Sequence, residues 1–398
     1  MFLLTLIKEL PETLCQVYNL QTLNLSNCWD LEKLPEGMGK LINLRHLINY
    51  GTRKLSCMPK GIERLVFLRT LSKLVVGGDG HNSRVCSLDC LKKFDYLRGS
   101  LVIRGLGNVI DGAEAMNADL RSKKYLLDLK LYFNYKSEAS STEVCRKDEV
   151  VLEALHAPPD LETLFLTGYR GITMSFDWMA SLTQLRKLTL KDCINCEHLP
   201  PLGKLPLLQY LEIRRGMRSL KRVGNEFLGI KNNDESSSSS LLIFFPKLNR
   251  LILENLENWE DWEYEITEDI AIMPCLSSCE IADCPKLKAL QRLNIDYCPV
   301  LKQWAAIYLH LPITSDRRQH TSLAFSKALD QTLGSFSACQ KSALQNLYIR
   351  QLSSLRIITG DKMLLGECAA SIAKTFLESD AAVIDIKQPE PVAAGIRL

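Results

Sequence analysis

The sequence lacks any apolar run long enough to cross a bilayer and any leader-like segment at its start. A membrane-spanning helix needs about 20 mostly apolar residues, and no stretch of the 398 residues approaches this length. The apolar residues Met1 to Ile7 are stopped by Lys8 and Glu9, and no basic segment precedes them as in a secretory signal. We therefore expect a cytoplasmic protein, with the nucleus and the inner face of the plasma membrane as further locations.

An excess of one charge is also lacking. The chain has 49 basic and 46 acidic residues, which gives a formal net charge of +3. Proteins that bind nucleic acid through its phosphates usually carry a strong basic surplus. The overall charge therefore gives no reason to expect a nucleic-acid partner.

Motifs of catalysis and cofactor binding are missing as well. The six histidines show no metal-ligand spacing such as HExxH, and no GxSxG nucleophile motif occurs. The Gly-rich stretch 75–83 has two interpretations, a phosphate cradle or an ordinary turn, and the absence of GxxxxGK[ST] favours the turn. Cys193 and Cys196 form a single CxxC without the second pair that a zinc site needs. We expect no enzymatic activity, no metal and no cofactor.

Fourteen cysteines suggest a disulfide scaffold, but their spacing favours another interpretation. Cys28, Cys193, Cys284 and Cys298 each close a short Leu-rich unit, at a position that points into a repeat core. A free cysteine packs there as a small hydrophobic residue. Buried reduced thiols are the favoured prediction, and disulfide bridges are the alternative.

What the sequence does contain is a leucine repeat. The spacing Leu-x-x-Leu-x-Leu-x-x-Cys occurs at Leu185 to Cys193 and begins again at Leu208, 23 residues later. Further units begin at Leu20, Leu44 and Leu68, at steps of 24 residues. This period is typical of leucine-rich repeats, in which stacked units bury each other's apolar side. The predicted fold class is α/β: a curved, horseshoe-shaped leucine-rich-repeat solenoid with parallel strands on the concave face and irregular or short helical returns.

The repeat pattern divides the chain into four parts. The predicted parts are a solenoid over 1–304 with a partial first repeat and a Ser-rich loop at 232–240, an irregular or helical segment over 305–343, a degenerate last repeat over 344–357, and a non-repeat tail over 358–398. The first repeat has no polar cap, so we expect further chain upstream of it. Leu276 and Leu290 begin two units only 14 residues apart, too few for a full repeat.

Between the repeat strands, three segments carry local predictions. Residues 111–123 have apolar positions at helical spacing and predict a helix. The polar segment 136–148 predicts an exposed loop, and 150–156 predicts a short helix ended by two prolines. Trp259 and Trp262 either contact a partner or pack under a repeat return, and packing is the favoured interpretation.

Repeat strands align their outward residues into columns, which gives the candidate binding residues. One column is predicted to hold Lys130, Phe165, Thr189, Glu212 and Ile252, and its neighbour Tyr132, Thr167, Lys191, Arg214 and Glu254. The candidate partner contacts are Lys130, Tyr132, Phe165, Lys191, Tyr210, Glu212, Arg214 and Arg215. Basic and aromatic side chains together suit a protein partner with an acidic patch. The alternative is a solvated face whose charges bind nothing.

The chain resembles the leucine-rich-repeat region of plant NB-LRR disease resistance proteins with a coiled-coil-type N-terminus. The stretches that carry this resemblance include LRGSLVIRGLGNV, LPPLGKLPLLQYLEI, FFPKLNRLILENLENWEDWE and IADCPKL, and together with related stretches they cover about residues 7–301 and 344–356. The resemblance implies an intracellular immune receptor whose repeats sense a pathogen effector or a guarded host protein and hold the receptor's own nucleotide-binding domain inactive.

The nucleotide-binding domain of that family is absent from this sequence. There is no phosphate loop, so the ADP or ATP that the resemblance implies is expected only in the missing domain, not in this chain. The resemblance therefore predicts a truncated member that keeps the protein-recognition module. An extracellular leucine-rich-repeat recognition domain and a non-functional receptor fragment are the alternatives.

Overall fold

The chain folds into two units that share one repeat architecture. The computed structural model describes residues 7–78, 85–133, 142–174, 177–230, 242–262 and 270–287, together with the backbone of 346–350. Unit 1 comprises Met1–Leu208 with Glu226–Gly229, and unit 2 comprises Gln209–Asn225 with Ile230–Leu398. We describe each unit by itself.

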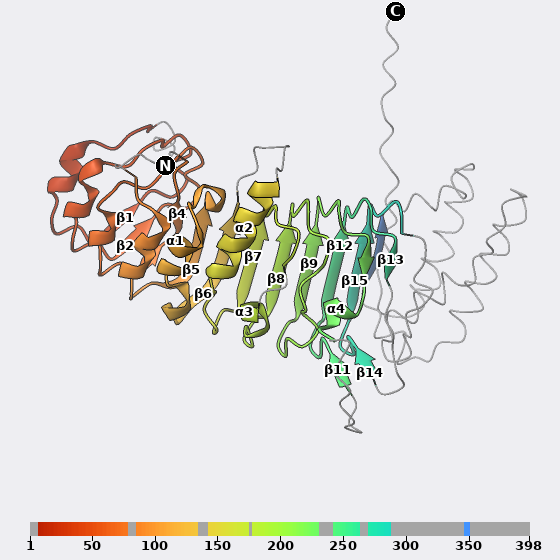
Figure 1. Cartoon of the computed structure of the whole chain (residues 1–398). Helices are drawn as coiled ribbons and strands as arrows, with labels where there is room; N and C mark the ends of the chain where they lie inside the picture. The colour runs from red at the N-terminus through yellow and green to blue at the C-terminus, as the bar shows by residue number, and fades with distance from the viewer. Residues whose placement is uncertain are drawn as a thin grey trace, which may run out of the picture. The chain divides into compact units, whose positions relative to one another are not determined.

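In unit 1, successive repeats contribute parallel strands in chain order (Figure 1). The strands are β1 (Thr22–Asn24), β2 (His46–Ile48), β3 (Thr70–Leu71), β4 (Lys73–Val75), β5 (Arg98–Arg104), β6 (Tyr125–Tyr132), β7 (Thr163–Thr167) and β8 (Lys187–Lys191). The first three form one sheet and β4 to β8 run through another. The leading leucines stand in register: Leu23 pairs with Leu47, and Leu164 with Leu188. The predicted leucine-rich-repeat fold is confirmed.

Unit 2 continues the same pattern. Its strands β9 (Tyr210–Arg214), β12 (Arg250–Glu254), β15 (Ser278–Ala282) and β16 (Asn346–Arg350) are parallel neighbours in this order. Two small ladders join its returns: β10 (Arg222–Val223) with β13 (Asp261–Trp262), and β11 (Leu242–Phe244) with β14 (Ile270–Ile272). Since β15 pairs with β12 and β16, both of its edges are occupied. The short unit predicted from Leu290 lies outside the described residues.

Stacking buries the repeat leucines, as the period predicts. Leu47, Leu71 and Leu188 in unit 1 are fully buried, and so are Leu211 and Leu251 in unit 2. One repeat alone would leave its leucines in water, and each buried leucine contributes about 1.5–3 kcal/mol. The fold is therefore stabilised between repeats rather than within them.

The cysteines that close the repeats are buried, as predicted. Cys28, Cys193 and Cys284 have at most 2% exposure, and the eleven cysteines of the described ranges are free thiols. The thiol of Cys193 donates to the carbonyl of Lys191, and that of Cys284 to the carbonyl of Ala282, at 3.4 and 3.3 Å. At these two positions the small side chain thus donates to the carbonyl two residues earlier. Cys298 lies outside the described residues.

A left-handed residue ends most repeat strands. It stands four positions after the first inward residue of the strand, a leucine or, before Asp283, Cys279, and has a positive φ at Asn27, Gly51, Gly105, Gly168, Asp192, Arg215, Asn255 and Asp283. Gly, Asn and Asp adopt this conformation at the lowest cost, which explains their recurrence here. The left-handed residue redirects the chain, but its backbone N–H can still bond to the neighbouring strand. The N–H of Gly105, for example, donates to the carbonyl oxygen of Tyr132 at 3.1 Å.

The returns of the N-terminal repeats are short helices. Single 3-10 turns form η2 (Glu12–Gln16), η3 (Glu36–Lys40), η4 (Ile62–Arg64), η5 (Leu88–Lys93), η6 (Leu106–Asn108) and η7 (Leu120–Ser122). The α-helices are α1 (Gly112–Asn117), α2 (Thr142–Ala154), α3 (Asp177–Ala180) and α4 (Asn225–Leu228). The predicted helix over 111–123 is too long, because Asp119 is left-handed and separates α1 from η7.

The prediction of a loop over 136–148 is wrong for the described residues 142–148, whereas the short helix predicted over 150–156 is confirmed as far as Ala154 but begins earlier. A single helix, α2, runs from Thr142 to Ala154 and buries Cys145, Asp148, Val151 and Leu152. Its charged residues suggest a solvent-exposed loop in the sequence, yet Asp148 is fully buried. Residues 136–141 lie outside the described ranges.

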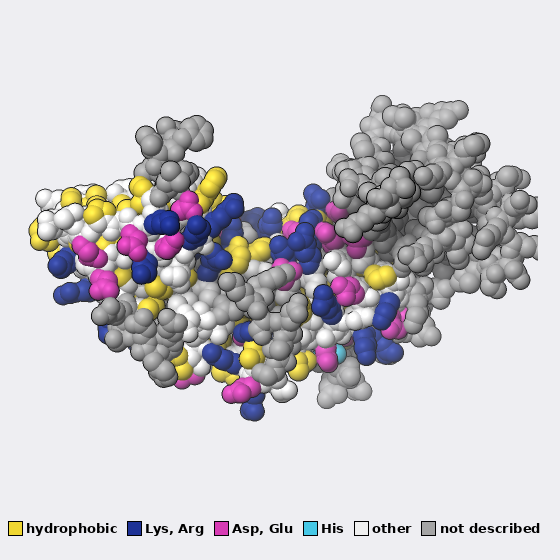
Figure 2. Space-filling model, turned by 90° about the horizontal axis from the view of Figure 1, so that it is seen from above, with side chains coloured by type: hydrophobic (Ala, Val, Ile, Leu, Met, Phe, Trp, Pro, Cys, Tyr) yellow, Lys and Arg dark blue, Asp and Glu magenta, His cyan; other side chains and the backbone are white. Residues whose placement is uncertain are grey.

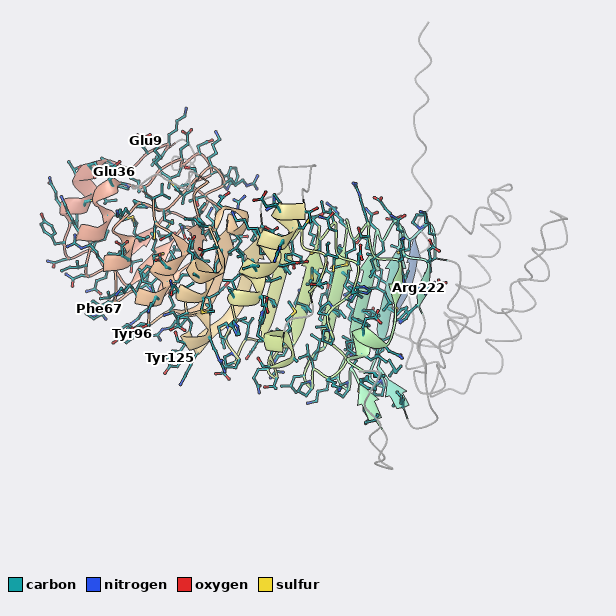
Figure 3. The ribbon with its side chains drawn as sticks, in the orientation of Figure 1. Glu9, Glu36, Phe67, Tyr96, Tyr125 and Arg222 are labelled. Carbon is teal, nitrogen blue, oxygen red and sulfur yellow. The ribbon has the colours of Figure 1, made fainter. Side chains whose placement is uncertain are left out.

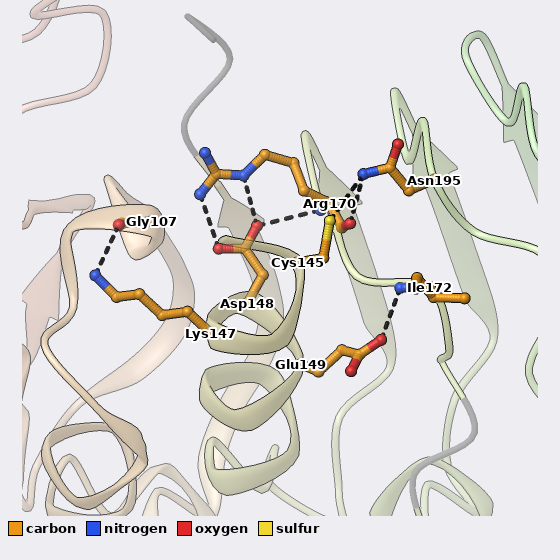
Figure 4. A network of polar contacts seen from close by, with 8 residues as sticks. All are labelled: Gly107, Cys145, Lys147, Asp148, Glu149, Arg170, Ile172 and Asn195. Atoms are coloured by element: carbon orange, nitrogen blue, oxygen red, sulfur yellow. Dashed lines mark hydrogen bonds and ion pairs between the residues drawn. The ribbon is translucent and has the colours of Figure 1, made fainter. Parts of the chain in front are cut away.

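A buried ion pair explains why Asp148 can lie inside unit 1 (Figure 4). Its carboxylate accepts two hydrogen bonds from the guanidinium of Arg170, each 2.8 Å long, and one from the Arg170 backbone N–H at 3.2 Å. The adjacent Glu149 accepts from the N–H of Ile172 at 2.7 Å, and Asn195 donates to Arg170 O at 2.8 Å. These contacts hold α2 against the turn that follows β7.

We predict that Gly105→Ala destabilises the fold more than Gly99→Ala. Both glycines are left-handed, with φ of 81° and 79°, so both variants carry the backbone strain of about 1–2 kcal/mol. A methyl group at Gly105 would also collide with the carbonyl oxygen of Val76, whereas at Gly99 it would meet nothing within 4 Å. Urea unfolding should show Gly105→Ala to be the less stable by a further ~1–3 kcal/mol. Equal losses would contradict the described turn.

We also predict that Asp148→Asn lowers the free energy of unfolding by about 3–5 kcal/mol, because it leaves the Arg170 guanidinium buried without a counter-charge. The control, Glu153→Gln, changes an exposed carboxylate of the same helix and should stay within about 0.5 kcal/mol. A double variant, Asp148→Leu with Arg170→Met, should recover much of the loss. Chemical denaturation measures all three, and a loss in Glu153→Gln as large as that in Asp148→Asn would refute the role of the ion pair.

Candidate protein-binding surface

The outward columns of unit 1 follow the predicted register. One column runs through Lys73, Val102, Lys130, Phe165 and Thr189, and its neighbour through Val75, Arg104, Tyr132, Thr167 and Lys191. Because parallel strands lie about 4.8 Å apart, residues of one column are close neighbours. The alignment predicted for Lys130 with Phe165, and for Tyr132 with Lys191 through Thr167, is confirmed.

An aromatic and basic cluster forms within these columns. The rings of Tyr132 and Phe165 have centroids 5.5 Å apart, and the guanidinium carbon of Arg104 lies 6.0 Å from the Tyr132 centroid. Burial raises the pKa of Tyr132, and the nearby Arg104 opposes that rise. The phenol is therefore neutral at physiological pH and can offer a hydrogen bond beside a cation. Arg and Tyr are the residue types that dominate the energy of protein interfaces.

The predicted lysines are half-buried and lie near carboxylates. Lys130 Nζ is 3.9 Å from Asp128, and Lys191 Nζ is 3.9 Å from Asp192. Pairs of this length near the surface contribute at most about 1 kcal/mol, so a partner's carboxylate can compete for either lysine. Basic side chains lie among acidic and apolar ones on the face seen in the space-filling view (Figure 2).

Unit 2 carries a network of ion pairs on its strands. Arg214 lies between Glu212, at 2.6 Å, and Glu254, at 3.2 Å. The hydroxyl of Tyr210 donates to Glu212 at 2.9 Å, and burial together with this carboxylate raises the pKa of Tyr210 to about 12. The predicted basic role of Arg214 is thus offset by its own neighbours. For this residue the structure favours the solvated, self-paired face that the sequence left as the alternative.

Three residues of the predicted outward columns, Thr167, Thr189 and Ile252, are buried instead. Thr189 is short and lies in register beside Phe165, whose larger side chain stands next to it. Ile252 is fully buried between Glu212 and Glu280, its neighbours in register. The prediction that these three positions face a partner is therefore corrected, because their side chains are not exposed.

The predicted proximity of Lys191 to Arg214 and Arg215 stays a prediction. Lys191 belongs to unit 1, whereas Arg214 and Arg215 belong to unit 2. Arg215 is exposed and occupies the left-handed position that ends β9. The candidate surface is accordingly assigned within each unit.

Sequence reasoning missed two cations of unit 1, Arg104 and Lys73. Arg104 comes directly after Ile103 in a strand that the leucine spacing had identified, and it pairs with Tyr132. Extending the column of Tyr132 by one repeat could therefore have identified it. Lys73 gave no such signal, because the strand path breaks at Ser72: Leu71 pairs back to Leu47, and pairing to β5 begins at Lys73.

Lys73 is held by the preceding repeat. The Asn49 side chain accepts from the Lys73 N–H at 2.8 Å and donates to its carbonyl at 2.7 Å, and the Lys73 amine donates to Thr52 O. Burial, and secondly the charge of Arg104, lowers the pKa of Lys73 to about 8. The column thus contains an amine that titrates near neutral pH.

The remaining sequence motifs are structural where they are described. Cys193 and Cys196 are buried; burial raises both thiol pKa values, that of Cys196 to about 12, and Cys196 donates to His198 O at 2.9 Å. Among the described residues, no group of His, Cys, Asp and Glu is placed to hold a metal ion. Of the Gly-rich stretch 75–83, residues 79–83 lie outside the described ranges.

Trp259 and Trp262 pack inside unit 2, which confirms the favoured interpretation. Both rings are almost completely buried, and their centroids lie 5.6 Å apart. The Trp259 indole N–H donates to Asp261 O at 2.9 Å. Neither ring is available to a partner.

None of the helices in the described ranges has the length and apolarity that a bilayer crossing requires.

Comparison with known proteins places these repeats among plant sequences. Residues 88–216 match the family model described as R13L1/DRL21 LRRs. A disease resistance protein of Arabidopsis thaliana is 41% identical over 290 residues, which is 71% of this chain and 19% of the relative. Disease resistance RPP13-like protein 1 of the same plant is 38% identical over 294 residues, 71% of this chain and 26% of the relative.

A third relative comes from another plant. Disease resistance protein RGA2 of Solanum bulbocastanum is 32% identical over 210 residues, which is 50% of this chain and 20% of the relative. The chain therefore spans about a fifth to a quarter of the length of these relatives.

We predict that Lys73→Met changes the pH dependence of stability. With a pKa of about 8 in the folded state against 10.5 unfolded, the unfolded chain binds more protons between these values. The free-energy cost of burying the charged Lys73 amine is therefore fully present below pH 8 and disappears as the pH rises toward 10.5. The stability of Lys73→Met relative to the natural protein should fall by roughly 1–3 kcal/mol across this window. Denaturation curves at several pH values test it, and a constant difference would contradict the buried amine.

Proposed function

Since this chain is a leucine-rich-repeat region of the type that plant NB-LRR disease resistance proteins carry, we propose that it is the protein-recognition module of an intracellular immune receptor. In this role the repeats bind a protein and catalyse nothing. The partner is a pathogen effector, a guarded host protein or the receptor's own nucleotide-binding domain. The cytoplasm is the proposed location, and no cofactor is bound by this chain.

One observation carries the proposal. In unit 1 the outward columns place Arg104, Tyr132 and Phe165 together on the strand face. None of the three is needed to fill the core, since the inward leucines of the same strands already do so. An Arg beside two aromatic rings, on a rigid sheet, is the composition expected of an interface hot spot.

The proposed mechanism is competition for this face. In the resting receptor the repeats contact the nucleotide-binding domain and keep it inactive, and a foreign ligand that binds the same residues displaces it. A ligand shifts such a balance only by its difference in affinity for the two states. In this proposal, nucleotide binding and switching belong to the receptor's nucleotide-binding domain and not to these repeats.

Free thiols are less consistent with the first alternative function, an extracellular recognition domain. An extracellular recognition domain of this cysteine content would be expected to carry disulfides, whereas the eleven cysteines in the described ranges are free and most are buried. A non-functional fragment would show no binding at all. The experiment below therefore separates this last alternative from the proposal.

The test is binding between this chain and the part of the Arabidopsis relative with 41% identity that this chain does not cover, expressed as a separate protein. We expect saturable binding that Arg104→Glu and Phe165→Ser each weaken by about tenfold, equivalent to ~1.4 kcal/mol. The control, Lys93→Glu, reverses an exposed charge on the η5 return and should bind normally. Absence of binding, or equal losses in all three variants, would overturn the proposal.

A further inference from the structure

Unit 1 exposes a second apolar surface, away from the outward strand columns. It consists of residues one or two positions before the opening leucine of consecutive repeats, which is Leu20, Leu44, Leu68, Leu97 or Leu126. We call it the edge stripe and define it as Tyr18, Ile42, Val66, Phe67, Tyr96 and Tyr125. Each of these large side chains is between 40% and 69% exposed.

The aromatic members form a ladder. Phe67 and Tyr96 stack with ring centroids 6.4 Å apart and planes 24° from parallel. Phe67, Tyr96 and Tyr125 follow one another along one edge of the ribbon, and all three point away from it (Figure 3). They lie at the same position of three consecutive repeats, 29 residues apart in each step. Contiguous exposed apolar side chains of this kind mark interaction surfaces.

The repeat does not require aromatic residues at this position. The equivalent residues of other repeats are Asn19, Asn43, Asp160 and Gln184, and the fold forms around them equally. The leucines that follow Asn43, Asp160 and Gln184 are almost completely buried and supply the core contact. The ladder is thus an addition confined to three repeats and not part of the packing pattern.

A basic row borders the edge stripe. In three consecutive repeats the residue directly after the opening leucine is an arginine: Arg45, Arg69 or Arg98. Within the described residues, none of these three arginines has an ion-pair partner. At the same position of a later repeat, Arg186 lies 4.0 Å from Glu162. The unpaired arginines therefore coincide with the repeats that carry the stripe, so the chemistry complementary to this surface is both apolar and acidic.

We propose that the edge stripe and its arginines bind an extended acidic segment with aromatic side chains, contributed by a partner protein. Strands about 4.8 Å apart place the repeats of Tyr18 and Tyr125 roughly 19 Å apart, which about six extended residues span. Alternate residues of such a segment face opposite ways, so aromatic side chains can lie on the ladder while carboxylates reach the arginines. This surface uses none of the strand-face residues of the proposed function and stands independently of it.

The experiment uses a fluorescein-labelled peptide of eight residues with alternating Glu and Phe, titrated against the full chain. We expect saturable binding. A peptide with Lys in place of Glu, and another with Ser in place of Phe, should bind at least about tenfold more weakly. No saturable binding of the Glu–Phe peptide, or equal binding of all three peptides, would overturn the proposal.

Variants at matched repeat positions locate the site. Tyr96→Ser and Arg69→Glu should each weaken the Glu–Phe peptide by about fivefold or more, whereas Gln184→Ser and Arg186→Glu, at the same two positions of a later repeat, should not. Thermal unfolding confirms that all four variants fold. Losses in the controls as large as in the stripe variants would overturn the assignment. So would concentration-dependent self-association that Tyr96→Ser abolishes, because the occupant would then be a second copy of this chain.

Discussion

The burial of leucines between neighbouring repeats is the interaction on which both units depend. A strand with two or three core leucines cannot exclude water from them by itself, so each repeat is stable only because the next one stands in register beside it. The left-handed residue after the strand and the thiol behind it serve the same end, since they return the chain to the core without leaving the ladder N–H unpaired. A change that shifts this register would therefore act on several repeats at once.

This inward constraint leaves the outward positions free, and it is their side chains that distinguish this chain from any other leucine-rich repeat. In unit 1 the strand face gathers Arg104, Tyr132 and Phe165, while the edge of the same repeats gathers Phe67, Tyr96 and Tyr125. The two surfaces lie at different repeat positions. A module of this construction can hold two protein segments at the same time, one on the strands and one on the edge.

Charges within the structure are compensated in ways that no local pattern reveals. Asp148 and Arg170 lie 22 residues apart in the sequence, yet they form a buried two-pronged ion pair that fixes helix α2. In unit 2, Glu212 and Glu254 hold Arg214 from both sides. Composition suggests an exposed loop in the first case and a free cation in the second. Both interpretations fail because a partner of each charge comes from another repeat: Arg170 for Asp148, and Glu254 for Arg214.

The sequence by itself determined the repeat period, the parallel register of the strands, the inward cysteines and the columns that place Lys130 beside Phe165, because each follows from a spacing repeated along the chain. Only the tertiary structure decided the length of α2, the burial of Thr167, Thr189 and Ile252, the position of Lys73 beyond the break at Ser72, and which cations are already paired. These depend on the size and charge of side chains in adjacent repeats. That information is not contained in the periodicity of any single repeat.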